Sequence, residues 1–358
     1  MRILFAVTGV GYGDATREHA NIEAFLKKDP NTKIMVAGYD NSLKYFKPKF
    51  PTIEIRGYKF TEQTMKFSAM KFALSNYPLP FKWTADAIKL KKQVKEFNPD
   101  IIISDFEPVG MILSRLLKKK GVFVFAYDPQ AYKICPYKNP KTNLQAKYFN
   151  TLYKSANAVI IPKLLGRKKE TYKKKYHYVN PIIRTKPSEL PPKDELMESL
   201  GLEREPIMVM LGGSKFGNIL ANKIMHFAHL FNEDFIIFGS QIEKKYRKNV
   251  KYYPFKKNVL EYMKVSKGVI TLGGHLTLSE TLAFKKPAMI FPIADHVEQI
   301  LNAYTLEGVS HVRYNLKDLR KHIKTFLRNL DPLKKRIPKI EFNGSEQIVD
   351  IVYNMLKK

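Results

Sequence analysis

Short apolar runs alternate with amphipathic segments along this chain, and this alternation constrains the fold more than any other feature. In the first half, the apolar runs are residues 2–8, 33–38, 52–56, 101–104, 122–126 and 158–161. In the second half they are residues 207–211, 235–238, 269–271 and 288–291. Apolar residues at helical spacing occupy residues 15–28, 111–120, 218–231 and 345–356. Continuous apolar strands separated by amphipathic helices indicate parallel sheets that are covered on both faces.

The alternation stops over residues 163–192, where the chain is first very basic and then rich in proline. Proline at this density indicates a linker, and 358 residues suffice for two domains of about 150 residues each. We therefore predict an α/β protein with two Rossmann-like, doubly wound domains, residues 1–184 and 185–342, facing each other across a cleft. The C-terminal helix, residues 343–358, can pack back on the first domain. Ligands of such sheets bind beyond the carboxyl ends of the strands, so we expect the site in the cleft.

Composition excludes several classes of protein. The single cysteine, Cys135, excludes an intramolecular disulfide and a thiolate zinc cluster. No apolar run approaches the roughly 18 residues of a membrane span, so we expect a cytoplasmic protein, either soluble or bound to the inner face of the cell membrane. The net charge of +29 favours polyanionic partners such as nucleic acid, nucleotides or anionic lipid. A generally lysine-rich surface explains the charge equally well.

Three glycine loops each follow a predicted strand and precede a predicted helix. Their sequences are Gly9-Val10-Gly11-Tyr12-Gly13-Asp14, Gly212-Gly213-Ser214 and Gly273-Gly274-His275-Leu276-Thr277. The first is explained either by a tight turn or by a loop that lets a substrate approach the backbone, with Asp14 at the cleft. The second and third expose backbone amides that can bind an anion at a helix N-terminus. Acidic and amide side chains follow the third loop at Glu280, Glu298 and Gln299, and such groups suit a ligand rich in hydroxyls.

Residues 271–303 resemble the donor signature of GT-B glycosyltransferases. The match is strongest to the family of the peptidoglycan N-acetylglucosaminyltransferase, which makes lipid II. The matching residues are the run from Gly273 to Glu280 and the ending Glu298-Gln299-x-x-Asn302-Ala303. The run Asn180-Pro181-Ile182-Ile183-Arg184 is similar to the interdomain segment. The sequence has no Asp-x-Asp run or histidine cluster of metal-ligand type, so we expect no metal ion if backbone amides suffice to bind the phosphates. The resemblance implies an inverting transfer of a sugar, such as an N-acetylhexosamine, from a UDP-sugar to a hydroxyl acceptor, including a lipid-linked one. It implies no other cofactor.

The same resemblance assigns roles to individual residues. Glu280 would bind the ribose, and Glu298 and Gln299 would bind hydroxyls of the transferred sugar. Phe255 lies where the family contacts uracil. The diphosphate would be held around the second and third glycine loops, at Gly212, Gly213, Ser214, Gly273, Gly274, His275, Leu276 and Thr277. The first loop, with Gly11, Tyr12 and Gly13, would serve the acceptor or a phosphate.

A general base must take the proton of the acceptor hydroxyl. The bacterial family has histidine after its first glycine loop, whereas this chain has Asp14, and other GT-B enzymes have Gly-Asp here. We therefore predict Asp14 as the base. Asp105 and Glu107 are the competing candidates, because they follow the buried run 101–104 and should face the same cleft. Asp105 is equally explained as a helix N-cap.

Two segments bear on the acceptor and on the charge. Residues 60–83 combine phenylalanines, two methionines and the only tryptophan with three lysines, and residues 163–175 carry seven positive charges and one acid. An apolar patch rimmed by lysine fits an anionic lipid surface, whereas a loop over the cleft and a solvated helix face explain the segments without lipid. Other functions stay open: a UDP-sugar 2-epimerase, a non-catalytic sugar-nucleotide sensor, or a basic nucleic-acid-binding protein. We find no nucleic-acid-binding motif and predict no specific nucleic-acid partner.

Overall fold

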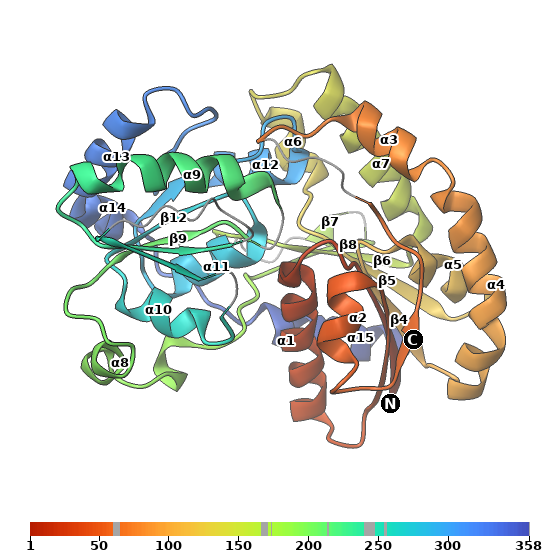
Figure 1. The fold of residues 1–358 in the computed structure, drawn as a ribbon. Helices are drawn as coiled ribbons and strands as arrows, with labels where there is room; N and C mark the ends of the chain where they lie inside the picture. Colours follow the sequence, from red (N-terminus) through yellow and green to blue (C-terminus); the bar gives the residue numbers. More distant parts are fainter. Residues whose placement is uncertain are drawn as a thin grey trace.

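The computed structural model describes residues 1–59, 65–165, 171–172, 174–212, 215–239, 248–253 and 256–357. The chain forms two sheets with helices on both faces, and the two sheets lie in separate lobes that meet along one side (Figure 1). The predicted α/β fold with two doubly wound domains is confirmed. Within the described ranges, no helix combines the length and apolar character that crossing a membrane requires.

The first sheet has the strand order β3-β2-β1-β4-β5-β6-β8-β7 and is parallel except for the edge strand β7. Its strands are β1 Arg2–Val7, β2 Lys33–Gly38, β3 Thr52–Glu54, β4 Ile101–Asp105, β5 Lys120–Val124, β6 Ala158–Pro162, β7 Thr171–Tyr172 and β8 Tyr176–Val179. The helices that cover it are α1 Tyr12–Lys28, α2 Asp40–Phe46, α3 Ala69–Asn76, α4 Leu79–Phe97, α5 Pro108–Leu116, α6 Pro129–Ile134 and α7 Pro140–Ser155.

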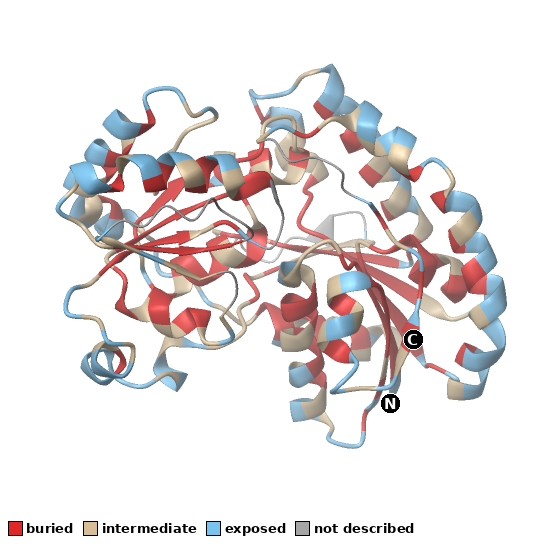
Figure 2. Cartoon of the chain, viewed as in Figure 1, coloured by how far each residue is buried: buried red, intermediate tan, exposed pale blue. Residues whose placement is uncertain are grey.

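Strand β1 shows why both faces of this sheet need helices. Successive side chains of a strand point to opposite faces, and every residue from Ile3 to Val7 is buried. Ile3 and Phe5 pack in one cluster with helix α1. Leu4 packs in another cluster with helices α4 and α5. Buried residues therefore run through the centre of each lobe, as Figure 2 shows.

The second sheet is parallel, with the strand order β11-β10-β9-β12-β13-β14. Its strands are β9 Ile207–Met210, β10 Phe235–Phe238, β11 Val250–Tyr253, β12 Gly268–Thr271, β13 Ala288–Ile290 and β14 His311–Val312. Its helices are α8 Lys193–Ser199, α9 Asn218–Phe227, α10 Val259–Val265, α11 His275–Ala283, α12 Val297–Thr305, α13 Leu319–Arg328 and α14 Leu330–Arg336. Short 3₁₀ turns lie at Pro187–Glu189, Lys215–Gly217 and Ala228–Leu230.

The last helix, α15 (Gly344–Leu356), returns to the first lobe and lies beside α1 (Figure 1). Ile348, Val349 and Val352 are buried in the same cluster as Ile22 of α1. The Ser345 hydroxyl donates to the Asn21 side-chain oxygen at 2.8 Å. The predicted packing of the C-terminal helix on the first domain is confirmed.

The prediction that the alternation stops over residues 163–192 is wrong for Tyr176–Val179, which form strand β8 beside β6. Only Val179 of this strand is fully buried, so the strand lacks the continuous apolar run that marks the central strands. Helix α7 was also not predicted, because its buried residues are mixed with polar ones along the segment.

We expect Ile348→Ala to lower the free energy of unfolding by about 2–5 kcal/mol, because it removes buried methyl groups between α15 and the first sheet. Urea denaturation of the full chain measures this loss. Asn354→Ala, at an exposed position of the same helix, is the matched control and should stay near the wild-type value. Equal stability of the two variants would contradict a structural role for α15.

Candidate active site

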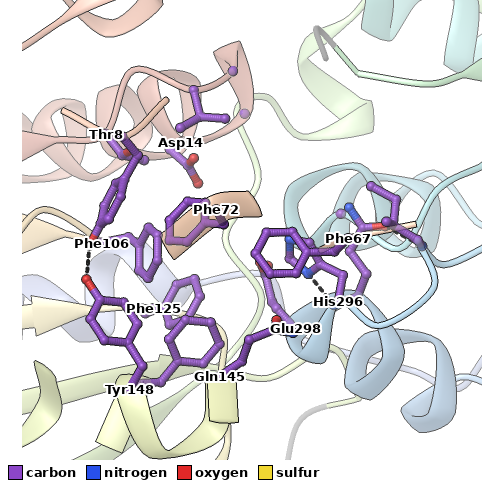
Figure 3. A pocket seen from close by; sticks show the side chains of 18 of the residues that line it. Thr8, Asp14, Phe67, Phe72, Phe106, Phe125, Gln145, Tyr148, His296 and Glu298 are labelled. Carbon is purple, nitrogen blue, oxygen red and sulfur yellow. Dashed lines mark hydrogen bonds between the residues drawn. The ribbon is translucent and has the colours of Figure 1, made fainter. Parts of the chain in front are cut away.

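A cavity of about 690 Å³ opens between the lobes at the carboxyl ends of the central strands. The first lobe contributes Thr8 and the first glycine loop up to Asp14, together with Arg17 and a group of aromatic side chains. The second lobe contributes Gly212, the start of helix α11 from Gly274 to Thr277, and residues around Glu298. Figure 3 shows Asp14 on one side of this space, with Glu298 and His296 opposite and the aromatic rings beside them. Residues from both lobes thus share one site.

Asp14 is held by an ion pair at the start of helix α1. Arg17, one turn later, donates through Nη2 to Asp14 Oδ1 at 2.9 Å. Its Nε and Nη2 also donate to Asp105 Oδ2, at 3.0 and 2.7 Å. Arg17 and Asp105 are buried, whereas 31% of the Asp14 side-chain surface is accessible. Asp14 is therefore the member of this cluster whose carboxylate faces the cavity.

Burial raises the pKa of Asp14 to about 6, with Asp105 adding to the rise and Arg17 opposing it. Its accessible surface lies on the cavity, so the group is desolvated by the surrounding protein and still reachable by a ligand. A carboxyl group with a pKa near neutrality is suited to accept a proton at physiological pH.

Glu298 is a second carboxyl group with a raised pKa, and it belongs to the other lobe. Burial raises its pKa to about 7, and Asp14 contributes to the shift. The electrostatic coupling to Asp14 acts across the cavity, because Glu298 lies on helix α12 and Asp14 on α1. The pKa of Glu298 therefore depends on the charge of Asp14.

Helix α12 positions the third glycine loop through two hydrogen bonds. Gly273 N donates to the Gln299 side-chain oxygen at 3.1 Å, and the Asn302 side-chain amide donates to Gly273 O at 2.9 Å. A methyl group on Gly273 would lie 2.6 Å from the backbone oxygen of Gln299, so only glycine fits. The side-chain oxygen of Gln299 thus positions the loop, and Gly274 and His275 begin helix α11 at the cavity wall.

Glu280 lies away from the cavity and is almost fully buried. Its two oxygens accept from Arg184 Nε and Nη2 at 2.6 and 2.7 Å. The ion pair joins the segment after β8 to helix α11. The role of Glu280 toward a ribose stays a prediction, and any ligand would share this carboxylate with Arg184.

The two competing acids occupy different surroundings. Asp105 ends strand β4 and binds Arg17, and it is not the predicted N-cap, since Glu107 occupies that position for helix α5. Glu107 is fully buried and is not among the described residues that line the cavity. Burial raises the pKa of Glu107 well above its usual value, and the Val109 backbone N–H opposes this rise.

Of the other predicted residues, Gly11, Tyr12, Gly13, Gly212, Gly274, His275, Leu276, Thr277 and Gln299 line the cavity. Gly212 has a φ of 71°, a left-handed conformation that favours glycine. Gly213, Ser214 and Phe255 lie outside the described residues. His275 is buried, and its Nε2 lies 3.1 Å from Pro162 O. Over the described ranges, the chain holds no group of three or more potential metal ligands.

A family model for glycosyl transferase family 1 matches residues 1–331. The chain belongs to this family. An uncharacterized glycosyltransferase of Methanosarcina mazei is 24% identical over 341 residues, which cover 87% of this chain and 85% of the relative.

A second relative connects this glycosyltransferase to the family that the donor signature resembles. It is the UDP-N-acetylglucosamine–N-acetylmuramyl-(pentapeptide) pyrophosphoryl-undecaprenol N-acetylglucosamine transferase of Clostridium tetani. It is 27% identical over 323 residues, covering 84% of this chain and 85% of the relative. In three dimensions the chain is similar to the spinosyn forosaminyltransferase SpnP, with a TM-score of 0.66, 14% identity and 100% coverage of both chains. The GT-B fold and the assignment as a glycosyltransferase are confirmed.

The sequence patterns of this glycosyltransferase do not indicate several residues of the site. Arg17 was not considered, although its spacing of three from Asp14 on a helix places the two side chains together. Gln145 and Tyr148 line the cavity from helix α7, which was not predicted. His296 also lines the cavity and was not predicted. Burial lowers the pKa of His296 to about 4, so its side chain is neutral at physiological pH.

We expect Arg17→Gln to lower the free energy of unfolding by about 3–5 kcal/mol, because it leaves the buried carboxylate of Asp105 without its partner. Thermal or urea unfolding of the full chain measures the effect. The control is Lys193→Gln, which removes a pair with Glu205 whose side chains are 43% and 38% exposed, so a change of about 1 kcal/mol or less is expected. A loss no larger than the control's would show that Asp105 is not held by this ion pair.

Proposed function

We propose that this glycosyltransferase moves a sugar, such as an N-acetylhexosamine, from a UDP-sugar to a hydroxyl acceptor, with inversion and without a metal ion. The observation that carries the proposal is the position of Asp14, a carboxylate with a raised pKa in a cavity that both lobes line. The name of the Clostridium tetani relative, a UDP-N-acetylglucosamine transferase, supports the choice of donor.

The donor would lie against the second lobe. Gly274 and His275 begin helix α11 at the cavity, and the backbone amides of a helix N-terminus favour a diphosphate through hydrogen bonds and the helix dipole. These amides are already oriented, so they stabilise the charge of the leaving UDP without rearrangement. A metal ion is not needed if these donors suffice, and transfer that persists in EDTA would support this part of the proposal.

The acceptor would lie against the first lobe, with its hydroxyl beside Asp14. The hydroxyl oxygen forms a bond to the anomeric carbon while the bond from that carbon to the diphosphate breaks. The electron pair leaves with UDP, and the hydroxyl proton passes to Asp14. Attack from the side opposite the leaving group inverts the anomeric carbon. General-base assistance of this kind contributes about 10²–10⁴-fold to the rate.

We expect Asp14→Asn to lower kcat at least a hundredfold while the Kd for UDP, measured by calorimetry, stays near the wild-type value. In the wild type, kcat/KM should fall as the pH drops below about 6, because protonated Asp14 cannot accept a proton. The measurement is the release of UDP from a panel of UDP-, GDP- and dTDP-sugars, with and without EDTA.

Glu298→Gln is the control for this pH dependence. Glu298 is the second carboxyl group with a raised pKa among the described residues that line the cavity. Its replacement should weaken binding of the sugar and retain the loss of activity at low pH. Near-normal turnover of Asp14→Asn would show that Asp14 is not the general base. No response to any nucleotide would overturn the proposed function.

We also propose that the enzyme binds the anionic inner surface of the membrane, where a lipid-linked acceptor would be found. Support comes from exposed apolar side chains on α3 and α4, namely Met70, Leu74 and Phe81, in a chain of net charge +29. The basic run 163–175 lies only partly within the described residues. In flotation assays, we expect binding to anionic vesicles at low salt, release at high salt, and no binding to neutral vesicles. Absence of binding to anionic vesicles at low salt would overturn the membrane proposal.

A further inference from the structure

The side of the cavity below Asp14 is built from aromatic rings (Figure 3). Phe72, Tyr58, Phe106 and Phe125 form a continuous stack, with ring centroids 5.5, 5.1 and 4.5 Å apart in that order. Trp83 meets Tyr58 edge to face at 5.1 Å. Tyr148, Phe149 and Pro80 complete the surface. We call these eight residues the aromatic wall.

One residue of this wall, Phe106, has an uncommon backbone conformation. Phe106 has a φ of 50°, in the left-handed region that bulky residues rarely adopt. Such strain persists only where the surrounding structure enforces it, and it is concentrated at functional sites. Here the conformation follows strand β4 directly and places the ring between Tyr58 and Phe125.

The tyrosine hydroxyls and the tryptophan N–H of the wall each have a hydrogen-bond partner within the protein. The Tyr58 and Tyr148 hydroxyls bond to each other at 2.6 Å, and the Trp83 indole N–H donates to Arg56 O at 2.9 Å. The nearby Asn76 side-chain amide donates to Lys59 O and Phe72 O, at 2.9 and 2.8 Å. The wall therefore presents ring surfaces to the cavity, and these suit an apolar ligand.

The charges of the cavity are unfavourable for an anion next to this wall. Of the described residues that line the cavity, the only Lys or Arg residues are Arg17 and Lys147. Arg17 binds two carboxylates, and Lys147 is exposed at the rim. The charged forms of Asp14 and Glu298 repel a negative group placed between them. A diphosphate on the acceptor would thus have few cationic partners beside the wall.

The wall continues to the surface through two exposed side chains. Tyr77, after α3, and Leu144, on α7, line the cavity and are 74% and 58% exposed. An apolar ligand longer than the cavity can therefore extend past these two side chains.

We propose that the acceptor is an uncharged apolar alcohol, whose hydroxyl is attached directly to an apolar body that lies against the aromatic wall while the hydroxyl meets Asp14. This inference rests on the proposed function and makes it more specific, because an acceptor sugar joined to lipid through a diphosphate would place polar groups against the wall. Aliphatic alcohols, such as prenols or dialkylglycerols, and aromatic alcohols share this chemistry.

The first experiment measures acceptor binding without any donor. Trp83 is the only tryptophan of the chain and belongs to the wall, so its fluorescence reports on ligands there. The probes are geraniol, 1-decanol and 2-naphthol, with decanoate as a charged counterpart of decanol. We expect saturable changes with the alcohols and binding of decanoate at least tenfold weaker, measured at high salt to screen the net charge. Comparison of geraniol with 2-naphthol separates aliphatic from aromatic acceptors.

Two neighbouring substitutions on α3 test the location. Ala73 lines the cavity, whereas Leu74 is 69% exposed and is not among its lining residues. Ala73→Phe should raise the Kd of the alcohols at least tenfold, because the added ring occupies their space. Leu74→Phe, the matched control, should bind as the wild type does. Neither substitution adds a tryptophan, so Trp83 remains the only source of tryptophan fluorescence in both variants.

The second experiment follows transfer from the UDP-sugar that gives the greatest UDP release. Its acceptors are geraniol, a dialkylglycerol and a short-chain prenyl-diphospho-N-acetylglucosamine. Transfer to an alcohol, lost in Ala73→Phe and retained in Leu74→Phe, supports the inference. Exclusive transfer to the diphosphate compound, tighter binding of decanoate than of decanol, or absence of alcohol binding overturns it. Alcohol binding without any use of nucleotide sugars would support the wall as a ligand site and overturn the proposed function alone.

Discussion

The guanidinium group of Arg17 connects the parts of the molecule on which the site depends. It lies on α1 and binds Asp105 at the end of β4, so it joins the first helix to a strand far along the chain. It also binds Asp14 and limits the rise of that group's pKa. Because Asp105 is fully buried, its charge requires this partner. The same ion pair therefore stabilises the first lobe and positions the proposed base.

The second lobe reaches the cavity through a loop that the first lobe holds. Phe67 N donates to Ala294 O at 2.8 Å, and Ala294 N donates to Met65 O at 3.0 Å. The Gln145 side chain donates to Asp295 O at 2.5 Å and accepts from Val297 N at 3.3 Å. Glu298 comes directly afterwards on α12. These contacts attach the loop before Glu298 to the first lobe.

Some residues of the site could be predicted from the sequence and others could not, for a physical reason. Asp14, Gly274 and Glu298 come after apolar strands, and the loops at the carboxyl ends of parallel strands gather at one edge of the sheet. Arg17 and Asp105 are 88 positions apart, and they meet only because Val7 of β1 pairs with Asp105 of β4. Gln145 and Tyr148 lie on a helix whose sequence does not indicate that it borders the cavity. Glu280 fits its motif, yet only the structure shows that Arg184 already binds its carboxylate.

The sequence by itself determined the α/β class, the presence of two Rossmann-like lobes and the family, because periodicity and short motifs are local properties of a chain. It also determined that a carboxylate comes after the first glycine loop. The tertiary structure decided which acid faces the cavity, which acids are buried, and that aromatic residues from several separate segments form one wall. Those outcomes depend on strand register, helix packing and the contacts between the lobes. Such contacts join residues distant in sequence, and they alone establish the burial and the charge around each group.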